Sequence, residues 1–102
     1  MGPMPFFAVT YTYADAADQR DIHRPAHRAF LKELFDAGTL AASGPFEPVP
    51  GRPDGALLVL RADDGAAALA ALDRDPFLLH GLIDDRSAQG WVPVTGPWAD
   101  EV

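Results

Sequence analysis

Two short segments of the sequence carry side chains that together could move a proton. The first is Arg24-Pro25-Ala26-His27 and the second, much further along the chain, is Asp75-Pro76-Phe77. A neutral imidazole that donates one N–H to a carboxylate keeps a single tautomer, and its other nitrogen is free to accept a proton. We therefore predict that the fold brings His27, as a base, to Asp75, which orients the ring.

Three further polar residues are candidates for substrate binding. Arg24 lies one helical turn before His27 on the same helix face, where a guanidinium could hold a carboxylate or a developing enolate. Ser43 could donate a hydrogen bond, and His80 is a secondary candidate for the wall of the same cavity. Such a set suits a cofactor-independent lyase or isomerase acting on a small oxygenated or aromatic metabolite.

A structural role for the same residues remains open. His27 can bury its ring and bond a helix partner while Asp75 only caps the turn before Pro76. The protein would then be a non-catalytic dimer that binds a small ligand or assists another protein. His23 and His27 stand four positions apart, but a metal site needs further ligands at matching geometry, so we predict none.

Composition and charge narrow the function classes. The 102 residues are 48% hydrophobic and 23% charged, which indicates one globular domain over residues 1–102. A net charge of -7 repels phosphate backbones, so nucleic acid is not an expected partner. The absence of cysteine fits a cytoplasmic protein. No apolar run reaches membrane-spanning length, and the first residues lack the pattern of a signal peptide.

Hydrophobic periodicity predicts the elements that must position the candidate residues. An apolar stripe at four-residue spacing indicates a long first helix, and Gly38 is well placed to end it. Pro25 predicts either a kink in that helix or the start of a new one. The stripe consists of Ile22, Ala26, Phe30 and Leu34. The expected strands are Pro5–Tyr13, Thr39–Ser43, Ala56–Arg61 and Ser87–Val94, and the expected helices are Ala16–Ala37, Gly65–Leu72 and a short one within Phe77–Ile83.

This order is that of the ferredoxin-like βαββαβ fold, an α+β architecture in which two main helices cover one face of a four-stranded antiparallel sheet. Right-handed crossovers place the first and third strands in the centre. Pro93 places the last strand at an edge, because it has no N–H to donate. Ala56–Arg61 is apolar on both faces, so the open face of the sheet needs a cover. We predict that a second copy provides it in a homodimer.

Taken together, the motifs resemble those of the YCII-related family. The resemblance rests on Arg24-Pro25-Ala26-His27, on Ser43-Gly44-Pro45, and on Asp75-Pro76-Phe77 with Gly81 beyond it. It covers nearly the whole chain. It implies a small bacterial protein with a dimeric α+β barrel fold akin to that of muconolactone isomerase.

The resemblance also implies a site built on a His-Asp pair, which maps onto His27 and Asp75. Arg24 and Ser43 fall on the other recurrent polar positions of the family. One characterised branch of the family eliminates hydrogen chloride from a hydroxylated chloroaromatic ring. Because one fold hosts many reactions, the resemblance alone does not identify the substrate.

Overall fold

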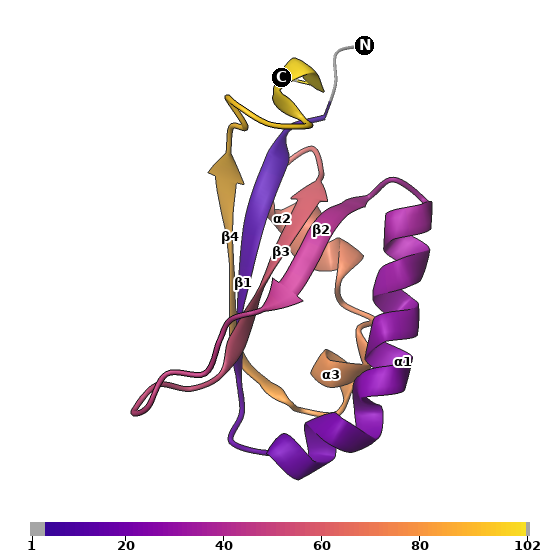
Figure 1. The fold of residues 1–102 in the computed structure, drawn as a ribbon. Helices are drawn as coiled ribbons and strands as arrows, with labels where there is room; N and C mark the ends of the chain where they lie inside the picture. Colours follow the sequence, from indigo (N-terminus) through magenta and orange to yellow (C-terminus); the bar gives the residue numbers. More distant parts are fainter. Residues whose placement is uncertain (1–3, 102) are drawn as a thin grey trace.

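The computed structural model describes residues 4–101, so residues 1–3 and 102 of the predicted domain lie outside the described part. Figure 1 shows how strands and helices alternate along the chain. The strands are β1 (Phe6–Tyr13), β2 (Leu40–Pro45), β3 (Gly55–Arg61) and β4 (Ile83–Trp91), and the helices are α1 (Ala17–Asp36), α2 (Gly65–Ala71), α3 (Pro76–Leu79) and the 3-10 helix η1 (Ala99–Glu101). The chain therefore has the predicted α+β fold.

The four strands of the described residues form one antiparallel sheet in the order β2-β3-β1-β4. β1 and β3 are the central pair, as the right-handed crossovers predict. Tyr11 lies opposite Ala56, and Val9 lies opposite Leu58. Residues two apart along a strand point to the same side of the sheet. In this register Val9, Tyr11, Ala56 and Leu58 therefore lie together on one large apolar face.

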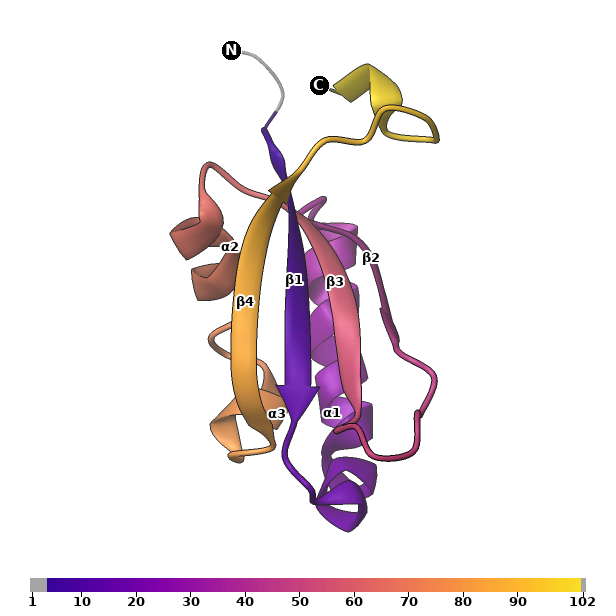
Figure 2. The ribbon, with the colours of Figure 1, turned by 90° about the vertical axis from the view of Figure 1, so that its left-hand side faces the viewer.

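The helices α1, α2 and α3 lie on that apolar face (Figure 1), and Figure 2 looks onto the opposite face, which they leave open. The core fills the space between sheet and helices. It is built mainly from alternate residues of β1 and β3 together with one side of α2, α3 and the turn after α3. Its most buried members are Val9, Tyr11, Leu58, Leu60, Ala68, Leu72 and Phe77. Among residues 4–101, no helix combines the length and apolar character of a membrane span.

Helix α1 runs without interruption through Pro25. Its N-terminal turns are inclined to the rest of the helix (Figure 1), as expected where a proline removes a hydrogen bond. Gly38, at a φ of +85°, follows the helix end as predicted.

The predicted apolar stripe of α1 is wrong in its first half. Ile22 is 65% exposed, whereas Arg20 and His27 are buried. The inward side of these turns is polar, because Arg20 bonds Asp54 and the Ala14 carbonyl. A pattern of apolar residues cannot reveal a helix face whose buried residues are polar.

Two strand boundaries also differ from the prediction. β4 begins at Ile83 and ends at Trp91, so Pro93 lies beyond it and the edge position of β4 comes from the topology alone. β2 extends to Pro45, which was expected in the loop. The N–H of the next residue, Phe46, bonds the Gly55 carbonyl, so the nitrogen of Pro45 points away from β3 and a missing donor there costs nothing.

The C-terminal segment covers one end of the open sheet face. Trp98 packs against Phe6 at a ring separation of 5.9 Å, within a small cluster that also includes Val59. Arg61 holds the segment in place with two hydrogen bonds to Glu101, of 2.7 and 2.8 Å. This geometry makes Trp98 a reporter of whether the segment is docked.

Replacing Glu101 with Gln should release this segment. Hydrogen bonds from Arg61 lower the pKa of Glu101, so the ion pair contributes stability above the usual glutamate pKa and loses it as the pH falls through the lowered value. We expect Glu101→Gln at neutral pH, and the wild type in acid, to shift tryptophan emission to longer wavelength. The neighbouring change Asp100→Asn is the control and should leave the neutral spectrum unchanged. Identical spectra for all three proteins would show that the ion pair does not hold the segment.

Candidate active site

The carboxylate of Asp75 lies at the centre of the candidate site and has no exposed surface. Its Oδ1 lies 2.7 Å from Nδ1 of His27 and accepts the backbone N–H of Phe77 at 2.9 Å. Its Oδ2 accepts the hydroxyl of Tyr11 at 2.9 Å. Three donors thus replace the water that a buried carboxylate has lost.

Local sequence chemistry explains why Asp75 stands at this point. It is the N-cap of α3, and Pro76 occupies the first turn of that helix, where a missing N–H is tolerated. The cap places the carboxylate at the start of α3, and the packing of α3 against α1 brings it to His27. The structure therefore brings together the two residues that we expected to meet.

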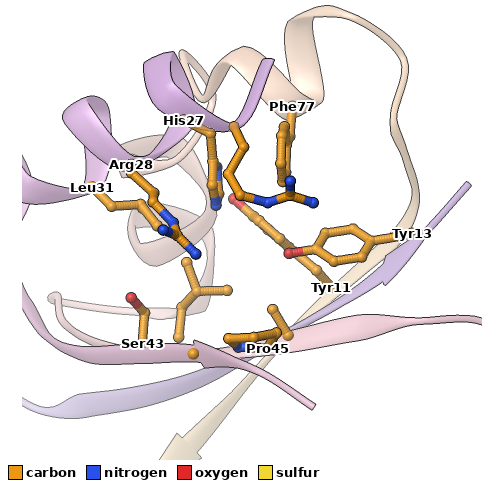
Figure 3. Close-up of a pocket in the computed structure, with 12 residues that line it drawn as sticks. Tyr11, Tyr13, His27, Arg28, Leu31, Ser43, Pro45 and Phe77 are labelled. Atoms are coloured by element: carbon orange, nitrogen blue, oxygen red, sulfur yellow. The ribbon is translucent and has the colours of Figure 1, made fainter. Parts of the chain in front are cut away.

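The ring of His27 is oriented by stacking as well as by its hydrogen bond to Asp75. The ring stacks on Phe77, with ring centroids 3.8 Å apart and an interplanar angle of 4°. Because Nδ1 points to Asp75, the tautomer with hydrogen on Nδ1 leaves a lone pair on Nε2. Figure 3 shows the tip of the ring directed into a cavity.

The cavity has a volume of about 300 Å³ and opens between α1, β2 and the ends of β1 and β3. Figure 3 shows Arg28 and Leu31 on the α1 side, Ser43 and Pro45 on the β2 side, and the Tyr13 hydroxyl facing inward. The remaining lining residues are Tyr11, Arg24, His27, Gly44, Ala56, Leu58 and Phe77.

The two tyrosines of this region are kept in their protonated form. Burial, followed by the charge of Asp75, raises the pKa of Tyr11 far above its usual value. The same two causes raise the pKa of Tyr13, although Arg20 and Arg24 oppose them. Both hydroxyls are therefore hydrogen-bond donors at neutral pH, Tyr11 toward Asp75 and Tyr13 toward the cavity.

The structure distributes the other predicted residues unevenly. Arg24 and Ser43 line the cavity with His27, and Arg24 also pairs with Asp21 at 2.6 Å.

His80 does not line the cavity, which contradicts our expectation for this residue. It lies at the end of α3, and its ring stacks on His23 at 3.7 Å. His80 is the C-cap of α3, five residues beyond the N-cap Asp75, and there its ring meets His23 of α1 instead of the cavity.

The rings of His23 and His27 stack on different partners, His23 on His80 and His27 on Phe77. Across residues 4–101, no three histidine or carboxylate side chains are grouped so that they could hold a metal ion.

Three residues of the site were missed as such by the sequence analysis: Tyr11, Arg28 and Phe77. Tyr11 fell within the expected strand Pro5–Tyr13 and was given no role in the site, yet it is the donor to Asp75. A tyrosine on the inward face of a central strand needs a partner for its hydroxyl, and that requirement was the available signal. Arg28, next to His27 in sequence, carried no comparable signal.

A family model for the YCII-related domain matches residues 4–92. Two proteins named YciI, from Escherichia coli O6:H1 and Shigella flexneri, are 32% identical to the chain over 82 residues, which covers 74% of this chain and 84% of each relative.

Solved structures share the fold. The 5-chloro-2-hydroxyhydroquinone dehydrochlorinase of Burkholderia phenoliruptrix AC1100, in complex with 2,5-dihydroxybenzoquinone, has a TM-score of 0.71 at 20% identity and covers 84% of this chain and 92% of its own. A Pseudomonas aeruginosa structure has a TM-score of 0.53 at 12% identity and covers 89% and 94%. At these identities the likeness concerns the fold.

Replacing Tyr11 with Phe should destabilise the protein through Asp75. The change removes the hydrogen bond to Oδ2 and leaves a buried charged atom without that partner, which costs about 1–3 kcal/mol. We expect a loss of this size in the free energy of unfolding, measured by urea denaturation. Tyr13→Phe is the matched control, because its hydroxyl faces the cavity, and should cost about 0.5 kcal/mol or less. Equal losses in the two variants would contradict a special role for the Tyr11 hydroxyl.

Proposed function

This chain belongs to the YCII-related family, and we propose that it is a cofactor-independent lyase or isomerase in which His27 abstracts a proton from a small oxygenated or aromatic substrate. The observation that carries the proposal is the 2.7 Å contact between Nδ1 of His27 and Asp75 at the wall of the cavity. A buried, fully hydrogen-bonded carboxylate is a strong orienter for an imidazole.

The chemistry follows from the free nitrogen. Nε2 of His27 takes a proton from a C–H or O–H of the substrate, and Asp75 stabilises the resulting imidazolium. The electron pair left on the substrate moves toward a neighbouring oxygen, where the cationic Arg24 offsets the developing charge. Return of the proton to another carbon completes an isomerisation, whereas loss of an anionic leaving group completes an elimination.

The dehydrochlorinase that shares the fold supports this reaction class. Its name describes the removal of hydrogen chloride from a chlorinated, hydroxylated ring, and its bound 2,5-dihydroxybenzoquinone is a single oxygenated ring. A cavity of about 300 Å³ is at the small end of ligand sites and suits a substrate of that size.

Replacing His27 with Gln should remove the reaction and keep the fold. The test incubates the protein in D2O with a panel of hydroxylated aromatic rings, small lactones and enolisable ketones, and follows product formation and deuterium incorporation by NMR. Because a positioned general base contributes about 10²–10⁴-fold, we expect the variant to lose a factor of this size in rate.

Two other histidines provide matched controls for that experiment. His23→Gln and His80→Gln remove rings that stack on each other outside the cavity, so both variants should turn over at close to the wild-type rate. The urea midpoint of each variant checks its folding. Undiminished turnover by a folded His27→Gln protein would exclude His27 as the base.

We further propose that the open face of the sheet is covered by a second copy of the chain. Figure 2 looks onto this face of the sheet. Its exposed apolar residues include Leu57, at 38% exposure, and Trp91, at 42% exposure. An apolar sheet face that meets water in a monomer is a common site of self-association. The family resemblance supports the same assembly.

A charge placed on this face should disrupt the dimer. We expect the wild type to sediment as a dimer and Leu57→Lys as a monomer in analytical ultracentrifugation, because burying an unpaired ammonium in an interface is costly. Leu79→Lys is the matched control, since Leu79 is an exposed leucine on α3, and that variant should stay dimeric. A monomeric wild type, or a dimeric Leu57→Lys, would refute this interface.

A further inference from the structure

Some basic side chains of the molecule form an ion pair with a carboxylate, and others do not. Of the eight basic residues in the sequence, five form ion pairs: Arg20 with Asp54, Arg24 with Asp21, Lys32 with Asp36, Arg61 with Glu101 and Arg86 with Asp73. Within residues 4–101, Arg28, Arg52 and Arg74 form no ion pair. Of these three, Arg28 lines the cavity that contains His27.

Arg28 lies one helical turn after Arg24, so two guanidinium groups border the same side of the cavity. Like charges at this spacing repel each other. Asp21 compensates Arg24 at 2.6 Å, but Arg28 has no such carboxylate in the described part of the chain. A bound anion would remove this imbalance.

The rest of the cavity wall is largely apolar. Leu31 lies on the α1 side of the cavity and Pro45 on the β2 side (Figure 3), and Leu58 forms part of the wall on β3. Phe77 adds a flat ring that stacks against His27. A wall of this kind accepts a flat, apolar body and leaves polar recognition to a few groups.

We propose that Arg28 is the anion-recognising residue of this cavity and that the substrate is a small acid, with a carboxylate or similarly compact anionic group on a flat apolar body. Arg28 holds the anion through charge-assisted hydrogen bonds, with the Ser43 hydroxyl on the facing wall (Figure 3). The inference rests on the proposed function for the reacting atom, because an anion held at Arg28 lets the attached body lie beneath Nε2 of His27.

The overall charge makes this local cation necessary. The chain carries a net charge of -7, and the carboxylate of Asp75 lies directly behind the imidazole. Both repel an approaching anion. The guanidinium of Arg28 at the cavity wall, which has no carboxylate partner in the described residues, opposes this repulsion where the ligand binds.

The test compares two probes of equal shape, benzoate and its neutral counterpart benzamide, by calorimetric titration at low ionic strength. We expect the wild type to bind benzoate more tightly than benzamide. Arg28→Gln should weaken benzoate binding about tenfold to hundredfold and leave benzamide unchanged, because it removes a hydrogen bond between charged groups. Added salt should weaken benzoate binding to the wild type, since Arg28 is exposed.

Arg74→Gln provides the matched control, because it removes the same charge from an exposed arginine outside the cavity. It should leave benzoate binding unchanged. Equal losses in Arg28→Gln and Arg74→Gln would reveal only the general field and overturn the proposal. Failure of the wild type to prefer benzoate over benzamide, including failure to bind either probe, would overturn it as well.

The same variants separate this inference from the proposed reaction. His27→Gln removes the base and should still bind benzoate through Arg28. If Arg28→Gln binds benzoate normally while His27→Gln loses turnover, the reaction stands and the substrate class is wrong. If benzoate binding requires Arg28 while turnover survives His27→Gln, the anion site stands and the assigned base is wrong.

Discussion

The buried carboxylate of Asp75 is the interaction on which the candidate site depends. A charged group without exposed surface is stable only if its oxygens accept hydrogen bonds, and here the donors come from three places: Tyr11 on β1, His27 on α1 and the first turn of α3. Each donor must keep its position for the other two bonds to remain good. The sheet and both helices are therefore tied to one another at the point where we propose that a proton is transferred.

The surrounding packing keeps these donors in place. Gly55 pairs opposite the end of β1, and a side chain there would collide with the carbonyl oxygen of Tyr11, so only glycine allows β3 to approach so closely. At the start of α1, Arg20 lies 4.8 Å from the centre of the Tyr13 ring and bonds Asp54 in the loop before β3. The first contact ties β1 to β3, and the second ties the start of α1 to the end of β1 and to the loop before β3.

Some features of the fold and of the candidate site depend on local sequence patterns and could be predicted, whereas others depend on tertiary contacts and could not. Local periodicity and turn chemistry determine the order of the elements and the end of α1 at Gly38, so both were predictable. The meeting of His27 with Asp75 could be inferred from their chemistry and from the family resemblance. The outward position of Ile22 could not, because it depends on buried polar contacts elsewhere on α1. The need of the Tyr11 hydroxyl for a partner was predictable, but the choice of Asp75 as that partner was not, and neither was the position of His80, because both depend on how single side chains are oriented after packing.

A second helix cap in the same chain, Asp64, shows whether Asp75 can be explained as a helix cap alone. Asp64 caps α2 by accepting the N–H of Ala67 at 2.8 Å, and it stays exposed to water. Asp75 caps α3 through an equivalent bond to Phe77, yet its carboxylate is fully buried. Capping contributes about 0.5–2 kcal/mol and does not require burial, whereas burying a carboxylate opposes folding. The cap alone therefore does not account for the burial of Asp75, whose carboxylate also bonds Tyr11 and His27. A fixed imidazole that faces a cavity is the arrangement that the proposed proton transfer requires.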